Sequence, residues 1–267
     1  MIRQLEKYAG KLAIDGSADE QRTALLARDD RLLCWGSESL LPLGQAVIER
    51  LNVISLVVAE PALPLIELML ARTSATEQQI VPQDTETRTF LHDIPIVRQE
   101  EFSVENPQRL VEQLGQRKGI LVKGVGIMAT GSVTIEQSYI NYSSVYHALF
   151  VKLLLALLTD PQPPTEEELA QLQPLWQQMK QDIPNHSEDL SSKLLDNKEA
   201  VLQAMDQVGK RTVALKLVDS FFGNISTCVE NQLFISQTGA SLDELPGCID
   251  RVPNDNSSTA GITASSE

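Results

Sequence analysis

The sequence has few cysteines, and the three present, Cys34, Cys228 and Cys248, lie far apart with no Cys-x-x-Cys pair. This excludes a small disulfide scaffold and a thiolate zinc knuckle, because both need several closely spaced cysteines. The lone thiols suit a reducing compartment, so we expect the protein to be cytoplasmic. The first ten residues, MIRQLEKYAG, contain no apolar run, and we expect no secretory signal there.

An excess of basic residues is also missing. The chain of 267 residues has 22 Lys and Arg against 36 Asp and Glu, which gives a net charge of −14. No cationic field then offsets the repulsion of phosphates, so a nucleic acid is not an expected partner. The longest apolar region, residues 51–71, is interrupted by Asn52, Glu60, Pro61 and Pro64. It is therefore not a membrane span, and we expect no membrane partner.

Apolar residues make up 42% of the chain, which is enough to bury a substantial core. Short apolar runs alternate with helical patterns in the first part of the chain, and this alternation predicts an α/β fold. The clearest helix is expected over residues 134–158, where aromatic residues recur at spacings of three and four. Thr134 and Gln137 have the spacing of a capping box. We assign the aromatic stripe to core packing rather than to a ligand site.

Residues 161–200 differ in composition, with three basic and eight acidic residues. Thr165 is followed by Glu166, Glu167 and Glu168, which suits the N-terminus of a helix. We therefore expect an acidic helical linker over this segment. The residues after Asn254 are rich in Ser, Thr and Ala, and a tail of this kind is usually poorly ordered.

Two other patterns suggest binding sites. Residues 124–131 read G-V-G-I-M-A-T-G between a predicted strand and a predicted helix, which is the setting of a dinucleotide-binding loop. The acidic residue that would bind the ribose is missing, so nucleotide binding is a rival hypothesis only. Asp84, Glu86, His92 and Asp93 could supply metal ligands. Their spacing matches no regular metal-binding motif, and a solvated loop explains them better.

The tail carries the most specific pattern. It contains F-G-N-I-S at residues 222–226, L-F-I-S-Q-T-G at residues 233–239, and A-G-I-T-A-S-S-E at residues 260–267. These segments supply small side chains, hydroxyls and open backbone N–H groups, which can bind a phosphate without Lys or Arg. Together and in this order they resemble the class II aldolase and adducin family, which includes fuculose phosphate aldolase and ribulose phosphate 4-epimerase. The resemblance covers residues 209–267 well.

The resemblance implies a phosphate-binding set and one metal ligand. The residues that match the phosphate-binding elements of the family are Gly223, Asn224, Thr238, Gly239, Ser265 and Ser266. The glutamate after the serine pair, here Glu267, contacts the catalytic zinc in the family and moves a proton. Zinc is then the expected cofactor, because it holds the enediolate of a sugar phosphate while a carbon–carbon bond breaks. A sugar phosphate is the expected small-molecule partner. The His-x-His and the later His of the metal site would follow Glu267.

Residues 37–160 resemble the rear half of the same family more faintly. The stretch from Leu41 to Pro61 is similar to the one that leads into His-x-His-Pro, with Val58 and Glu60 in the positions of the two histidines. Lys118, followed by glycine, resembles the later His-Gly of the family. All three zinc histidines are then replaced. Valine cannot bind zinc, and a protonated lysine is a donor rather than a ligand.

The resemblance therefore predicts a three-layer α/β/α fold with a mostly antiparallel central sheet, class II aldolase-like and incomplete. Residues 1–160 would be a degenerate rear half, residues 161–200 the linker, and residues 201–267 a front half cut at its C-terminus. A piece of a longer tandem protein or a circularly permuted unit would give this order, and we favour the tandem. The expected function is that of a class II aldolase-like protein of sugar-phosphate metabolism, inactive as this chain. The alternative is a non-catalytic, adducin-like interaction module, and a homo-oligomer is left open.

Overall fold

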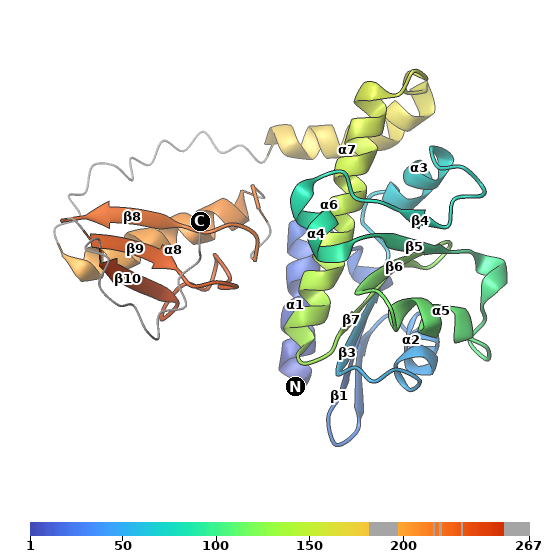
Figure 1. Cartoon of the computed structure of the whole chain (residues 1–267), viewed down its shortest axis with the longest axis horizontal. Coiled ribbons are helices and arrows are strands. Elements are labelled where there is room, and N and C mark those ends of the chain that lie inside the picture. Colours follow the sequence, from blue (N-terminus) through green and yellow to red (C-terminus); the bar gives the residue numbers. More distant parts are fainter. Residues whose placement is uncertain (182–196, 216, 219–220, 231, 254–267) are drawn as a thin grey trace. The chain divides into compact units, whose positions relative to one another are not determined.

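The computed structural model describes residues 1–181, 197–215, 217–218, 221–230 and 232–253. The chain divides into two compact units, Met1–Gln177 and Gln178–Glu267 (Figure 1). The boundary falls inside the segment that the sequence marks as a linker. The expected division into a rear half, a linker and a front half stays a prediction.

The first unit is built on a seven-stranded sheet with the order β2-β1-β3-β7-β6-β5-β4. All neighbouring strands in it pair antiparallel except β5 and β6, which are parallel. The mostly antiparallel sheet is therefore confirmed. Its strands are β1 (Thr23–Arg28), β2 (Leu32–Gly36), β3 (Ser55–Ala59), β4 (Gln79–Ile80), β5 (Ile94–Val97), β6 (Gly119–Val122) and β7 (Gly126–Gly131).

Helices cover both faces of this sheet and complete a three-layer α/β/α arrangement (Figure 1). On one face α6 packs on β3, β6 and β7, with α1, α3 and α4 packed against it. On the other face α2 and α5 pack on the sheet and on each other. The helices are α1 (Ile2–Asp15), α2 (Leu41–Ile48), α3 (Leu65–Ala71), α4 (Thr85–Leu91), α5 (Gln108–Leu114), α6 (Ile135–Thr159) and α7 (Glu166–Gln181), with short 3-10 turns η1 (Glu20–Arg22) and η2 (Gln99–Glu101).

The central strands β3, β6 and β7 are buried along their whole length, because helices lie on both of their faces. Ser55 marks the α6 face, since its hydroxyl donates to the carbonyl of Thr134 at 2.7 Å and bonds Ser138 at 2.9 Å. Leu56 and Val58 point the other way, into an apolar core that α2 and α5 share with the sheet. The alternation along β3 thus divides the core into two layers.

The long helix is confirmed almost as the sequence predicts it. Helix α6 begins after Thr134, whose side chain accepts a hydrogen bond from the N–H of Gln137 at 3.1 Å. Tyr139 and Tyr142 from the aromatic stripe are buried in the core. By length and composition alone α6 could also cross a membrane, with a hydropathy of 1.4. Here it packs along the sheet, as the central helix of one layer.

Residues 1–36 belong to the same unit as the residues that follow. Strand β1 pairs with β2 on one side and with β3 on the other, so the N-terminal hairpin is part of the central sheet. Helix α1 packs against α6, β1 and β2, and it ends at Gly16, whose φ of 77° is left-handed. The first unit therefore includes residues 1–36 in addition to residues 37–160, which the faint resemblance covers.

The dinucleotide-loop hypothesis for residues 124–131 is wrong. Residues 126–131 form β7, and the residues before them make the tight turn from β6 to β7. The glycines consequently lie in a hairpin and a buried strand. They do not form the loop that opens a helix at its N-terminus, which is what phosphate binding of that kind needs.

The second unit contains helix α8 (Lys198–Ala214) and a three-stranded antiparallel sheet of order β10-β9-β8. Its strands are β8 (Ser226–Val229), β9 (Gln232–Ser236) and β10 (Ile249–Pro253). Val201 and Met205 of α8 pack with Phe234 of β9 in a small core. An added Cβ at Gly209 would lie 2.0 Å from the carbonyl oxygen of Leu242, so the loop after β9 packs directly on α8.

Candidate functional site

The first position to examine is Val58, which the family resemblance places where a zinc histidine would be. It lies on β3 opposite Met128 of β7 and is fully buried in the apolar core on the α2 and α5 face. An aliphatic side chain in that setting offers no electron pair to a metal.

Glu60 directly follows β3 and is tied to the turn before β1. Its N–H donates to the carbonyl of Arg22 at 3.0 Å, and its carbonyl accepts from the N–H of Asp19 at 2.8 Å. Its carboxylate forms an ion pair with the guanidinium of Arg22. The cationic side chain of Arg22 thus lies beside the carboxylate of Glu60 at this end of the sheet.

Lys118 does not lie near Glu60, so its assignment as the third metal position is wrong. Ala59 pairs with Ile127, and Val122 pairs with Gly126, which places Glu60 at the β6–β7 turn. The carbonyl of Lys118 instead accepts from the N–H of Thr130, at the opposite end of β6 and β7. The strand register therefore separates the two residues along the sheet.

The residues that do lie beside Glu60 are Val125 and Gly126. An added Cβ at Gly126 would lie 2.2 Å from the carbonyl oxygen of Ala59 and 2.9 Å from the Cα of Glu60. Val125 is buried in the same core as Val58. The sequence contains a signal for this alternative, because Val125-Gly126 is a second residue–glycine pair close to Lys118-Gly119.

These side chains do not fit zinc. Two of the three positions are valine, and the third, Glu60, is paired with Arg22. No group of three or more His, Cys, Asp or Glu that could hold a metal occurs among the residues that the structure describes. Glu267, the other expected ligand, lies outside them.

Asp84, Glu86, His92 and Asp93 do not converge on a metal either. Asp84 caps the N-terminus of α4 by accepting from the N–H of Thr87 at 2.7 Å, whereas His92 follows the C-terminus of the same helix. Asp93 is held by two hydrogen bonds from the guanidinium of Arg117, at 2.9 and 2.6 Å. These contacts are structural, but the solvated loop that the sequence suggests is wrong, because Thr85–Leu91 form helix α4 with Thr87 and Leu91 buried.

A buried polar network lies behind Glu60 on the α6 face. The hydroxyl of Tyr142 donates to the carbonyl of Ser17 at 3.0 Å, and the hydroxyl of Ser17 donates to Asp15 at 2.5 Å. Burial raises the pKa of Tyr142 well above its ordinary value, and burial with the charge of Asp15 raises the pKa of Tyr146 to about 12. Both phenols are therefore protonated at neutral pH, and the hydroxyl of Tyr142 ties α6 to the residues that follow α1.

In the second unit, strand register brings two of the expected phosphate-binding turns to one end of the sheet. Ser226 pairs with Ile235, and the N–H of Ser236 donates to the carbonyl of Ile225 at 2.9 Å. Continuing this register places Gly223 and Asn224 across from the residues that lead into Thr238 and Gly239. Gly223 and Gly239 both have left-handed φ, of 85° and 75°. Ser265, Ser266 and Glu267 lie outside the described residues, so the complete set stays a prediction.

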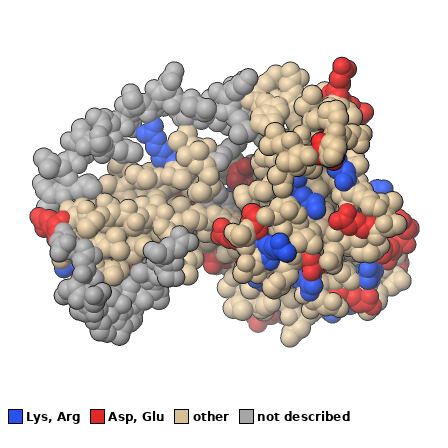
Figure 2. Space-filling model, turned by 45° about the horizontal axis from the view of Figure 1, so that its top comes forward, with Lys and Arg blue, Asp and Glu red and all other residues tan. Residues whose placement is uncertain are grey.

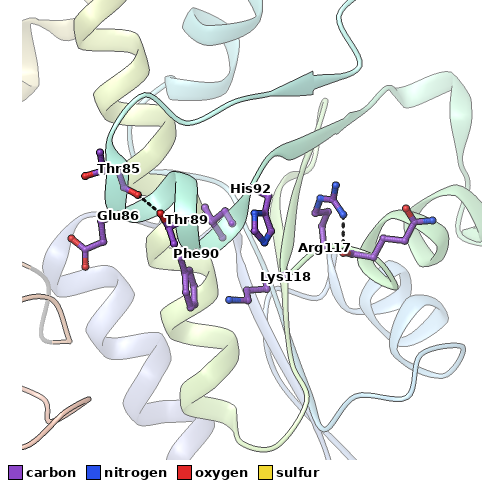
Figure 3. A pocket seen from close by; sticks show the side chains of 9 residues that line it. Thr85, Glu86, Thr89, Phe90, His92, Arg117 and Lys118 are labelled. Carbon is purple, nitrogen blue, oxygen red and sulfur yellow. Dashed lines mark hydrogen bonds between the residues drawn. The ribbon is translucent and has the colours of Figure 1, made fainter. Parts of the chain in front are cut away.

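A hollow on the first unit lies elsewhere, between α4 and the start of β6 (Figure 3). Its volume is about 760 Å³, and it is open to solvent. The side chains of Phe90, His92, Arg117 and Lys118 line it together with the first turn of α4. Nζ of Lys118 lies 3.2 Å from the centroid of the Phe90 ring, and burial lowers the pKa of this lysine.

Sequence comparison gives no family for this chain: no family model matches it, and no curated protein matches it. Structural comparison finds solved proteins with a similar fold. L-fuculose-1-phosphate aldolase from Thermus thermophilus superposes with a TM-score of 0.50 at 16% identity, over 61% of this chain and 97% of that one. A sugar-phosphate aldolase from Thermotoga maritima has a TM-score of 0.48 at 18% identity, over 61% and 97%. YgbL, a putative aldolase/epimerase/decarboxylase from Escherichia coli, has a TM-score of 0.49 at 13% identity, over 64% of this chain and 96% of that one.

The second unit is too short to hold a match over 61% of the chain, so much of the match lies in the first unit. That unit has the three layers and the mostly antiparallel sheet that the resemblance predicts. At 16% identity the likeness concerns the fold and not the chemistry. The chain carries a class II aldolase-like fold.

Proposed function

We propose that this chain is a class II aldolase-like protein of sugar-phosphate metabolism whose first unit has lost the metal site. One observation carries the proposal: at the place where β3 meets the β6–β7 turn, the side chains are Val58, Val125 and a Glu60 that Arg22 already neutralises. When bound, zinc would supply the positive charge that stabilises an enediolate. These residues cannot hold it, so no metal-dependent cleavage is assigned to them.

Phosphate recognition is assigned to the second unit. The two turns, Gly223-Asn224 and Thr238-Gly239, flank one end of its sheet, and each contains a glycine with a left-handed φ, as phosphate-binding turns often do. Ser265, Ser266 and Glu267 would complete the set. The substrate class, the cytoplasmic location and any homo-oligomer stay proposals, and no feature of the described residues favours the adducin-like alternative.

The first test uses the full chain with L-fuculose 1-phosphate, the sugar phosphate in the name of the Thermus aldolase. We expect no release of cleavage products above a zinc-only blank, and we expect weak binding of the sugar phosphate in a calorimetric or NMR titration. Asn224→Ala combined with Thr238→Val should weaken that binding about tenfold, because two donors to a charged group are lost.

Val58→Leu, at the defunct metal position, is the matched control and should leave the binding unchanged. Zinc-dependent cleavage by the unaltered chain would overturn the loss of the metal site. Binding that is insensitive to the double substitution would overturn the role of the second unit.

A further inference from the structure

The hollow between α4 and β6 has a charge arrangement that neither the aldolase-like fold nor the lost metal site explains. Two fixed cationic side chains line it, Arg117 and Lys118. Arg117 is neutralised, because its guanidinium makes two hydrogen bonds to Asp93 and one to the carbonyl of Gln116. Lys118 has no such carboxylate partner among the described residues, and this suggests that it binds a ligand.

Among the described residues Lys118 has no carboxylate partner, and its interaction is with the ring of Phe90 (Figure 3). Glu86 lies on the lining but is not paired with the lysine. Lys118 is half-buried, and desolvation alone lowers its pKa. A partly buried ammonium group without a counter-ion is costly, and an anion that enters the hollow would remove that cost.

The remaining lining is suited to an apolar group. Phe90 is 36% exposed although it is a large aromatic residue, whereas its neighbour Leu91 is buried. His92 adds an exposed imidazole at the rim, on a backbone with a φ of 66°. An open concave surface with one unpaired cation and exposed aromatic area has the features of a small-molecule site.

We propose that this hollow binds a small organic anion, whose charged group pairs with Nζ of Lys118 and whose apolar part lies against the exposed part of the Phe90 ring. All of its lining residues belong to the first unit, and Lys118 lies at the opposite end of β6 from the region around Glu60. It is therefore independent of the function proposed above.

The test is an NMR titration of the full chain with three probes: benzoate, benzyl alcohol and inorganic phosphate. Benzoate should give saturable shifts of the amide signals of Phe90, His92 and Lys118. Benzyl alcohol, which lacks the charge, and inorganic phosphate, which lacks the ring, should each bind about tenfold more weakly.

Lys118→Gln should weaken benzoate binding about tenfold, whereas Lys118→Arg, which keeps the charge, should retain most of it. Lys123→Gln is the matched control, because it removes one charge from an exposed position at the other end of β6 and should leave the affinity unchanged. Equal binding of benzoate and benzyl alcohol, unchanged binding in Lys118→Gln, or no saturable shift with benzoate would each overturn the proposal.

Discussion

Arg72 is a largely buried cationic side chain that requires a partner. Only 8% of it is exposed, and its guanidinium makes two hydrogen bonds to Glu168, at 2.6 and 2.8 Å. Glu168 also accepts from the N–H of Thr165 at 2.8 Å, while Thr165 caps the N–H of Glu168 at 3.2 Å. One carboxylate therefore neutralises a cation next to α3 and completes a capping box at the start of α7.

Glu168→Gln should lower the free energy of unfolding of the first unit by about 2 kcal/mol at pH 7, because the buried Arg72 then keeps only the more distant carboxylate of Asp160, at 3.5 Å. Chemical denaturation followed by circular dichroism measures this. Lys210→Gln is the control, since it removes an exposed i,i+4 pair with Asp206 and should change stability by about 0.5 kcal/mol or less. Equal effects of the two substitutions would contradict the stabilising role of the Arg72–Glu168 pair.

The same substitution has a defined dependence on pH. The hydrogen bond from Arg72 lowers the pKa of Glu168 from 4.5 to about 2. Because the pKa is lower in the folded state, the stabilisation is fully present above about pH 4.5 and is lost as the pH falls toward about 2. The difference between the original chain and Glu168→Gln should shrink over that range. A difference in the free energy of unfolding that stays constant down to pH 2 would contradict the lowered pKa of Glu168.

Two glycines show how the same residue type is used differently in two elements. At Gly126 the φ is 134°, and an added Cβ would lie 2.2 Å from the carbonyl oxygen of Ala59, so the turn needs glycine. At Gly10, inside α1, no atom lies within 4 Å of the added Cβ. In α1 glycine only lowers helix stability.

Gly126→Ala should therefore destabilise the first unit by about 2 kcal/mol or more, because both strain and a clash arise. Gly10→Ala should stabilise it by about 0.5–1 kcal/mol. Thermal and urea unfolding of the two variants, in parallel with the original chain, measure both effects. The result that would argue against the hairpin geometry is a tolerated Gly126→Ala.

At the scale of the whole molecule, acidic residues outnumber basic ones, 36 to 22. The face in Figure 2 shows Lys and Arg side chains interspersed with Asp and Glu on the first unit. The net charge of −14 belongs to the chain as a whole and favours solubility over association with polyanions. The absence of a nucleic-acid partner stays a prediction.

Because each unit has its own sheet and its own apolar core, the two should unfold independently. We expect two transitions in calorimetry of the full chain. A fragment of residues 1–181 should retain the transition of the first unit with its midpoint unchanged within a few degrees. Two results would contradict this expectation and show that the units unfold together. One is an unfolded fragment, and the other is a single transition of the full chain that the fragment does not show.

Local sequence determined much of this architecture. The spacing of aromatic residues predicts α6, and Thr134 and Thr165 predict helix starts, because both signals act within a few residues of the chain. The replacement at Val58 could likewise be predicted, since it lies in a continuous stretch that resembles the family. The α/β class follows from the alternation of the same short patterns.

Only the tertiary structure decided what lies next to Glu60. The sequence offers Lys118-Gly119 and Val125-Gly126 as similar pairs, and the register of β6, β7 and β3 selects the second. The ion pair of Arg22 with Glu60 and the hollow at Lys118 likewise join residues from separate elements. Strand pairing is set by contacts across the whole core, so no local pattern contains it.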